Sequence, residues 1–191
     1  MTNYWPARYE VGMIWMAYIA GGLVGLIVLM ALIGLLLPRA HVAARRAVLA
    51  RPPGDVWAAL TDLEAQPRWR KGLKRLERLD GTRFRETTTQ GAITFEIIEE
   101  RPPELRITRI ADDELPFGGR WIYELSPDGD GTRLEITEDG FIKNPVFRFL
   151  ARTVFSTSAT MEAFLRDLSA HLGVAASIEP AEPSQLAASP R

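Results

Sequence analysis

The chain begins with one long apolar segment that has no counterpart later in the sequence. Residues 12–37 contain no charged side chain and no Asn, Gln, His or Pro. As an α-helix this segment would be about 39 Å long, against about 30 Å for the hydrocarbon core of a bilayer. The alternative, a secretory signal peptide, has a shorter apolar core and a small-residue cleavage site. Because Pro38-Arg39-Ala40-His41 is a poor cleavage site, the pattern predicts a permanent single-pass membrane anchor within residues 1–38.

Charges on the two sides of the span predict its orientation. Before the span the only basic residue is Arg8, which Glu10 offsets. Four arginines follow the span: Arg39, Arg45, Arg46 and Arg51. By the positive-inside rule, the part of the chain after the span is expected in the cytoplasm.

Two glycines in the span indicate a contact between membrane helices. Gly21 and Gly25 form a G-x-x-x-G pattern. Small residues at this spacing let two helices approach closely, so the pattern predicts a homodimer face. The alternative is the ordinary glycine content of membrane helices.

The rest of the chain predicts one α+β domain over residues 45–173, after a short linker at 39–44. Alternating apolar and polar residues, punctuated by turn sequences, are typical of antiparallel strands with one solvated face. Seven strands are expected, at 45–51, 74–79, 83–89, 92–99, 105–111, 120–125 and 132–141. The alternation predicts one shared face carrying Ile93, Phe95, Ile97, Leu105, Ile107, Trp121, Tyr123, Leu134 and Ile136. Between the first two strands, the apolar spacing from Val56 to Leu63 predicts a short helix.

A long C-terminal helix is expected to cover that face. Asn144 and Pro145 suit its N-cap and first turn, and Gly173 suits its end. Small hydroxyl residues interrupt its apolar stripe: Ser156, Thr157, Ser158 and Thr160. They predict a gap between helix and sheet, unless they bond to the backbone or to water. Residues 174–191 have no periodicity and are expected to be disordered.

Composition limits the chemistry. The formal net charge is −1, there is no Cys, and there are two His. Nucleic-acid binding needs a strong basic footprint, so we expect no nucleic-acid partner. Without Cys and with so few His, we expect no metal site, no cofactor and no Ser-His-Asp triad.

One segment is basic, however. Residues 68–78 carry six basic side chains and one acidic one. A face toward anionic lipid headgroups is one interpretation, each basic residue contributing about 1 kcal/mol. A solvated rim of the fold is the other. The membrane-facing candidates are Arg70, Lys71, Lys74 and Arg75.

The order of elements, from one strand through two short helices and six strands to a long helix, resembles the helix-grip fold of the SRPBCC superfamily. That superfamily includes START lipid-transfer domains and polyketide cyclase/dehydrase-like proteins. The likeness covers about residues 45–172. Its clearest stretches are PGDVWAALTD (53–62), PRW (67–69), LPFGGRW (115–121), GTRL (131–134), ITEDG (136–140) and NPVFRF (144–149).

The resemblance implies a cavity between a curved sheet and the long helix, usually filled by a hydrophobic ligand. Large side chains on the two facing surfaces are the candidate lining: Trp69, Phe95, Trp121, Tyr123, Ile136, Phe155 and Met161. Each of them also suits an ordinary core position. We therefore expect a membrane-tethered protein that binds or transfers a lipid or another hydrophobic small molecule.

Two other functions remain open from the sequence. Cyclase-like relatives imply an enzyme, for which the acid–base candidates are Glu86, Glu96, Asp113 and Tyr123. Alternation turns Glu96 away from the Phe95 face, and we assign no catalytic residue. An interaction module that reports ligand state to a partner is the third hypothesis.

Overall fold

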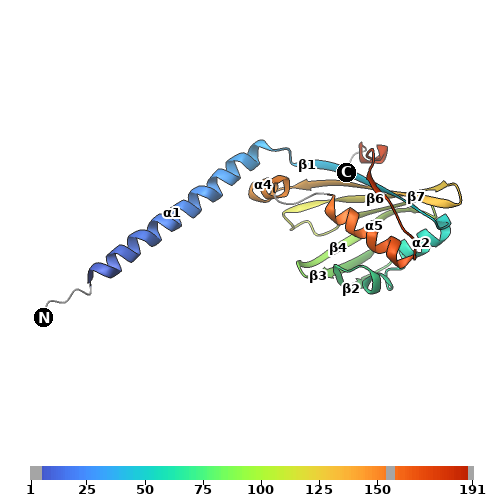
Figure 1. Ribbon diagram of the computed structural model, residues 1–191, viewed down its shortest axis with the longest axis horizontal. Coiled ribbons are helices and arrows are strands. Elements are labelled where there is room, and N and C mark those ends of the chain that lie inside the picture. Colours follow the sequence, from blue (N-terminus) through green and yellow to red (C-terminus); the bar gives the residue numbers. More distant parts are fainter. Residues whose placement is uncertain (1–5, 154–157, 189–191) are drawn as a thin grey trace.

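The computed structural model describes residues 6–153 and 158–188, with side chains from residue 12 onward. Helix α1 (Pro6–Leu36) projects from a domain built on one curved sheet (Figure 1). Two short helices, α2 (Pro53–Thr61) and α3 (Gln66–Trp69), follow the first strand. This mixed α+β architecture confirms the predicted helix-grip fold.

The sheet has eight antiparallel strands in the order β2-β3-β4-β5-β6-β7-β1-β8. Their bounds are β1 (Ala40–Leu49), β2 (Leu73–Arg78), β3 (Arg83–Thr88), β4 (Gly91–Arg101), β5 (Leu105–Ile110), β6 (Phe117–Asp128), β7 (Gly131–Ile142) and β8 (Ile178–Pro180). The predicted linker at 39–44 is wrong for most of its length, because residues 40–44 pair with residues 137–141 of β7. Only Leu37, Pro38 and Arg39 separate α1 from the sheet.

The predicted long C-terminal helix is two helices, α4 (Pro145–Thr153) and α5 (Ala159–His171). Asn144 Oδ1 accepts hydrogen bonds from the backbone N–H groups of Val146 (2.9 Å) and Phe147 (3.1 Å), which confirms the N-cap. Ser158, directly before α5, lies in a turn, and Ser156 and Thr157 lie outside the described residues. Short hydroxyl side chains such as that of Ser158 compete with helical hydrogen bonds. Helix α4 packs against α1, whereas α5 packs against β1 and α3. Continuous helical spacing in the sequence could not reveal that difference.

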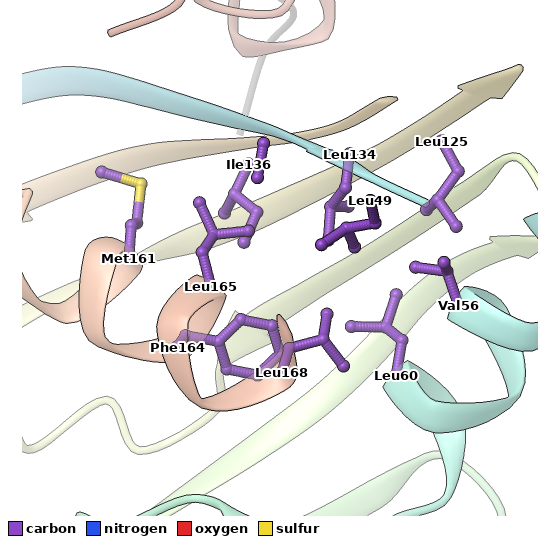
Figure 2. Close-up of a cluster of buried hydrophobic side chains, with 11 residues drawn as sticks. Leu49, Val56, Leu60, Leu125, Leu134, Ile136, Met161, Phe164, Leu165 and Leu168 are labelled. Carbon is purple, nitrogen blue, oxygen red and sulfur yellow. The ribbon is translucent and has the colours of Figure 1, made fainter. Parts of the chain in front are cut away.

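Helix α5 covers the inner face of the sheet, which we define as the face carrying α2 and α5. Its residues Met161, Leu165 and Leu168 are fully buried against Leu134 and Ile136 of β7 (Figure 2). Burying one such side chain contributes about 1.5 to 3 kcal/mol to folding.

Polar contacts fix both ends of α5. At its start, Arg45 of β1 donates through Nε to Glu162 Oε1 (2.9 Å) and through Nη2 to Ser158 Oγ (2.7 Å). The first of these bonds holds the pKa of Glu162 below its ordinary value. At its end, Gly173 has a φ of 69°, and the Val174 N–H donates to Ser169 O (3.0 Å). This left-handed turn confirms Gly173 as the helix stop.

The outer face of the sheet has an apolar cluster of its own, formed by Leu105, Ile107 and Ile122. The prediction that Leu105 and Ile107 share the inner face is wrong. In the register, Arg106 pairs with Tyr123 on the inner face. Ile107 pairs with Ile122 on the outer face, because successive side chains of a strand point to opposite faces. A register shift between β4 and β5 at 97–99 precedes this pair and breaks the simple alternation.

The C-terminal segment covers the outer cluster, so the prediction of disorder is wrong for residues 178–188. Strand β8 pairs with β1, and a short 3-10 helix, η1 (Gln185–Ala188), places Leu186 and Ala187 on the cluster. Arg120 Nη2 donates to Leu186 O (2.9 Å), and the Ser184 N–H donates to Thr137 Oγ1 (2.9 Å). Residues with so little periodicity fold here because the sheet presents them with an apolar surface.

Replacing Leu186 by Ala should lower the free energy of unfolding by about 1 to 2 kcal/mol, less than for a fully buried leucine because Leu186 is half-buried. Urea unfolding followed by tryptophan fluorescence measures the change. Gln185→Ala, at the exposed neighbouring position, is the control and should have little effect. Equal stabilities of the two variants would contradict the packing of this segment.

Candidate functional site

Beside the α5 core lies a small polar pocket in the interior of the domain. Its volume is about 20 Å³, and Leu60, Phe84 and Phe164 form part of its apolar wall. Its polar lining consists of Gln66, Arg70, Glu86, Arg106, Thr108 and Tyr123. A water molecule needs about 10 to 15 Å³ by this kind of measure, so the pocket has room for about one water.

Arg70 and Glu86 form an ion pair on one side of the pocket. Arg70 Nη2 donates to Glu86 Oε2 (2.9 Å), and Nη1 donates to Glu86 Oε1 and to Gln66 Oε1 (2.7 Å). The Arg70 guanidinium also lies 5.3 Å from the centre of the Phe164 ring. The interpretation of Arg70 as a membrane-facing residue is therefore wrong. Directly after α3, the Arg70 side chain points toward Glu86 of β3. The residues next to Arg70 in the sequence do not indicate this direction.

Arg106 of β5 is the most deeply buried charge in the pocket, with an exposed fraction of 3%. Its Nη1 lies 3.4 Å from Leu60 O, and its Nε lies 3.2 Å from Glu100 Oε1 without hydrogen-bond geometry. Burial lowers the pKa of Arg106 from its ordinary value. Buried polar atoms are nearly always hydrogen-bonded, so an unsatisfied guanidinium nitrogen marks a place where a further acceptor fits.

Aromatic rings form the wall next to these charges. Phe164 of α5 lies 5.6 Å from Trp69, 6.1 Å from Trp121 and 5.9 Å from Tyr123, centre to centre. Burial raises the pKa of the Tyr123 phenol well above its usual range, so the hydroxyl stays protonated. Sequence reasoning missed Phe164, although its spacing from Met161, Leu165 and Leu168 is that of one helix face.

The predicted lining residues divide into three groups. Trp69, Trp121 and Tyr123 meet around Phe164 beside the pocket, whereas Phe95 is farther along the inner face, stacked on Phe84 at 5.5 Å. Ile136 and Met161 are core residues with no exposed surface, and neither lines the pocket. Phe155 lies outside the described residues.

Two of the four acid–base candidates, Glu86 and Tyr123, line the pocket. Glu96 points to the outer face and pairs with Arg109 (2.6 Å), as the alternation predicts. Asp113 lies exposed in the loop before β6.

Neither histidine contributes to the pocket. His41 Nε2 lies 3.2 Å from Glu138 Oε1, and the His171 ring stacks on Trp69 at 5.4 Å. Among the described residues, no three His, Cys, Asp or Glu side chains gather closely enough to hold a metal ion.

The other three candidates for membrane contact lie at the β2 edge of the sheet. Lys71, Lys74 and Arg75 are exposed at and before β2, which is at the opposite edge from β1 and β8 (Figure 1). Arg75 pairs with Glu77 (2.8 Å).

A larger groove of about 440 Å³ is open to solvent between α2 and the end of α5. Asp55, Asp62 and small alanines line it, and it contains none of the predicted lining residues. This groove does not lie between α5 and the inner face of the sheet. We therefore take the smaller pocket as the candidate site.

Helix α1 contains one stretch, Gly12–Leu36, that is long and apolar enough to cross a membrane, with a mean hydropathy of 2.7. Membrane spans and N-terminal signal sequences both have these properties. A Cβ atom built on Gly21 or Gly25 would meet nothing within 4 Å, so this face is open to a neighbour.

Comparison with known proteins places the domain. Residues 39–173 match the family described as polyketide cyclase / dehydrase and lipid transport. A search of curated proteins found no match.

Three solved structures share the fold. A conserved protein from Geobacillus kaustophilus is similar with a TM-score of 0.62 and 14% identity, over 73% of this chain and 99% of its own. A START superfamily protein from Mycobacterium smegmatis has a TM-score of 0.55 and 19% identity, over 70% and 97%. Norcoclaurine synthase from Thalictrum flavum, in complex with dopamine and hydroxybenzaldehyde, has a TM-score of 0.57 and 14% identity, over 70% and 86%. The family match over residues 39–173 shows that this chain belongs to the polyketide cyclase/dehydrase and lipid transport family.

Proposed function

We propose that this chain is a membrane-anchored protein that binds a lipid or another amphiphilic small molecule between α5 and the inner face of its sheet. The observation that carries the proposal is the buried guanidinium of Arg106 beside an aromatic wall, since its Nε has an ion-pair contact with Glu100 but no hydrogen bond. Ligand sites combine apolar walls with a few converging polar groups that orient the ligand. The family to which the chain belongs includes lipid transport.

Binding requires the domain to open, because a pocket of about 20 Å³ cannot hold a lipid. Phe164 is the side chain that fills the space between Trp69, Trp121 and Tyr123. An outward displacement of α5 would free the volume of that ring. Each methylene buried by the ligand contributes about 0.8 kcal/mol, so an eight-carbon chain would offset an opening cost of about 6 kcal/mol.

The proposed anchor is α1. In its support, the apolar stretch is longer than a signal-peptide core, and only three residues separate α1 from β1. The arginines after the span favour a cytoplasmic domain. The open face at Gly21 and Gly25 favours a homodimer through α1.

We expect the full-length chain, purified in detergent, to retain an amphiphile that native mass spectrometry detects. Arg106→Met keeps an unbranched apolar stem but removes the guanidinium and its charge, and should lower retention at least about tenfold, since a charge-assisted hydrogen bond contributes about 1.5 to 3 kcal/mol. Arg109→Met is the matched control, because Arg109 lies on the same strand and points to the outer face. A chain without any bound amphiphile, or equal retention by both variants, would refute the proposal.

An enzyme acting on a hydrophobic substrate is the second candidate. Its support is that a carboxylate, Glu86, and a protonated phenol, Tyr123, line the same pocket. Norcoclaurine synthase, whose structure contains dopamine and hydroxybenzaldehyde, is an enzyme with a similar fold. In such a reaction Glu86 would accept a proton, and the protonated Tyr123 hydroxyl would donate a hydrogen bond to the substrate.

The burial of Tyr123 has a consequence for stability at high pH. Its pKa is raised in the folded state, so the unfolded chain loses this proton first, at about pH 10. The contribution of Tyr123 is therefore complete below pH 10 and is lost above it, by about 1.4 kcal/mol per pH unit. Unfolding free energies of the wild type and Tyr123→Phe, measured from pH 9 to 11, should diverge accordingly. Tyr18→Phe, in the span, serves as the control, and parallel wild-type and Tyr123→Phe profiles would contradict the burial of this hydroxyl.

A further inference from the structure

The end of α1 and the short helix α4 form a packed junction that the ligand site does not use. Along the last turns of α1, Gly34 is buried and Met30 and Ala31 are half-buried, as is Leu37 directly after the helix, while most of their neighbours are exposed. These positions form one stripe of the helix. Gly34 lies directly against α4, because a Cβ atom at this position would be 1.9 Å from Pro145 O. Only glycine permits this approach of the two backbones.

Arg148 of α4 fastens the junction. Its Nη1 donates to Gly34 O (2.8 Å) and Leu37 O (3.1 Å), which are carbonyls at the end of α1. Its Nη2 donates to Lys143 O (3.1 Å) and its Nε to Ile142 O (3.2 Å). A buried cation therefore satisfies the helix end that carries unpaired carbonyls and partial negative charge. Helix α4 is held at a defined position beside α1, rather than on a flexible tether.

Helix α4 is strongly two-faced. At 100° per residue, Val146, Phe147, Leu150 and Ala151 lie on one side. The other side carries Arg148 and Arg152, together with Phe149. Phe147 is 51% exposed, and Leu36 at the end of α1 is 87% exposed. A large aromatic ring in water beside the end of an apolar helix is unfavourable, since burying it would contribute about 1.5 to 3 kcal/mol.

The position of α4 along α1 identifies what covers this apolar face. The shielded stripe from residue 30 to residue 37 spans about 10 Å of helix and overlaps the end of the apolar stretch Gly12–Leu36. With α1 across a bilayer, α4 is then level with the membrane interface. Amphipathic helices in that region bury their apolar face about 5 to 10 Å below the surface.

We propose that α4 is an interfacial membrane helix whose Phe147 face lies in the lipid bilayer beside α1. The inference rests on the proposed membrane anchor and adds a second membrane-contacting element to it. Exposed cations near α4, Arg39, Lys143 and Arg152, lie where anionic headgroups would be. The membrane therefore meets the β1–β7 side of the domain, and the basic segment at β2 is on the opposite edge of the sheet.

The absence of cysteine from the chain allows single-cysteine labelling without background. Full-length Phe147→Cys, Val24→Cys and Asp130→Cys variants, labelled with a bimane fluorophore, are reconstituted in phosphatidylcholine–phosphatidylglycerol vesicles. The vesicles contain lipids with a doxyl quencher at carbon 5 or at carbon 12. Val24 lies near the middle of the apolar stretch, and Asp130 is exposed in the β6–β7 turn. Ala151→Cys, on the apolar side of α4, repeats the measurement if labelling at position 147 disturbs folding.

We expect the label at 147 to be quenched at least about twofold more by the carbon-5 quencher than by the carbon-12 quencher, the label at 24 to show the reverse preference, and the label at 130 to be unquenched. Quenching at 24 with none at 147 or 151 would overturn the interfacial helix while leaving the anchor intact. No quenching at 24 would overturn the anchor, and the inference with it.

Discussion

The contact between α5 and the inner face of the sheet is the interaction on which the domain depends. Met161, Leu165 and Leu168 bury completely against β7, and α2 closes the same core from its other side. Without α5, a large apolar surface of the sheet would face water, which is unfavourable. Phe164, which lines the pocket, is on the same helix as these core residues. The opening proposed above would therefore disturb the packing that stabilises the domain.

The pocket beside that contact has an unusual composition for the interior of a small domain. Its ion pair, its buried arginine and its phenol together carry a desolvation cost that apolar side chains of similar size would avoid. Removing one charged member would leave its partner with a buried charge that has no counter-ion, so each charge in the cluster depends on another. Such an arrangement is expected where a protein must recognise a polar group within an apolar space.

The domain also shows how elements at the ends of the chain take their structure from the sheet. The C-terminal segment folds on the outer apolar cluster, and Arg148 binds the end of α1 to α4. The C-terminal segment has little apolar surface of its own and takes its structure from the sheet. In both places the contacts join residues that are far apart in the sequence.

Local patterns in the sequence determined the long apolar helix, the strands, the N-cap at Asn144, the stop at Gly173 and the family resemblance, because each depends on residues within a few positions of one another. They also predicted Trp69, Trp121 and Tyr123 near one site. Only the tertiary structure decided the inward direction of Arg70, the outer position of Ile107, the central place of Phe164, the division between α4 and α5, and the order of residues 178–188. These features depend on strand register and on partners from distant segments, which no local periodicity encodes.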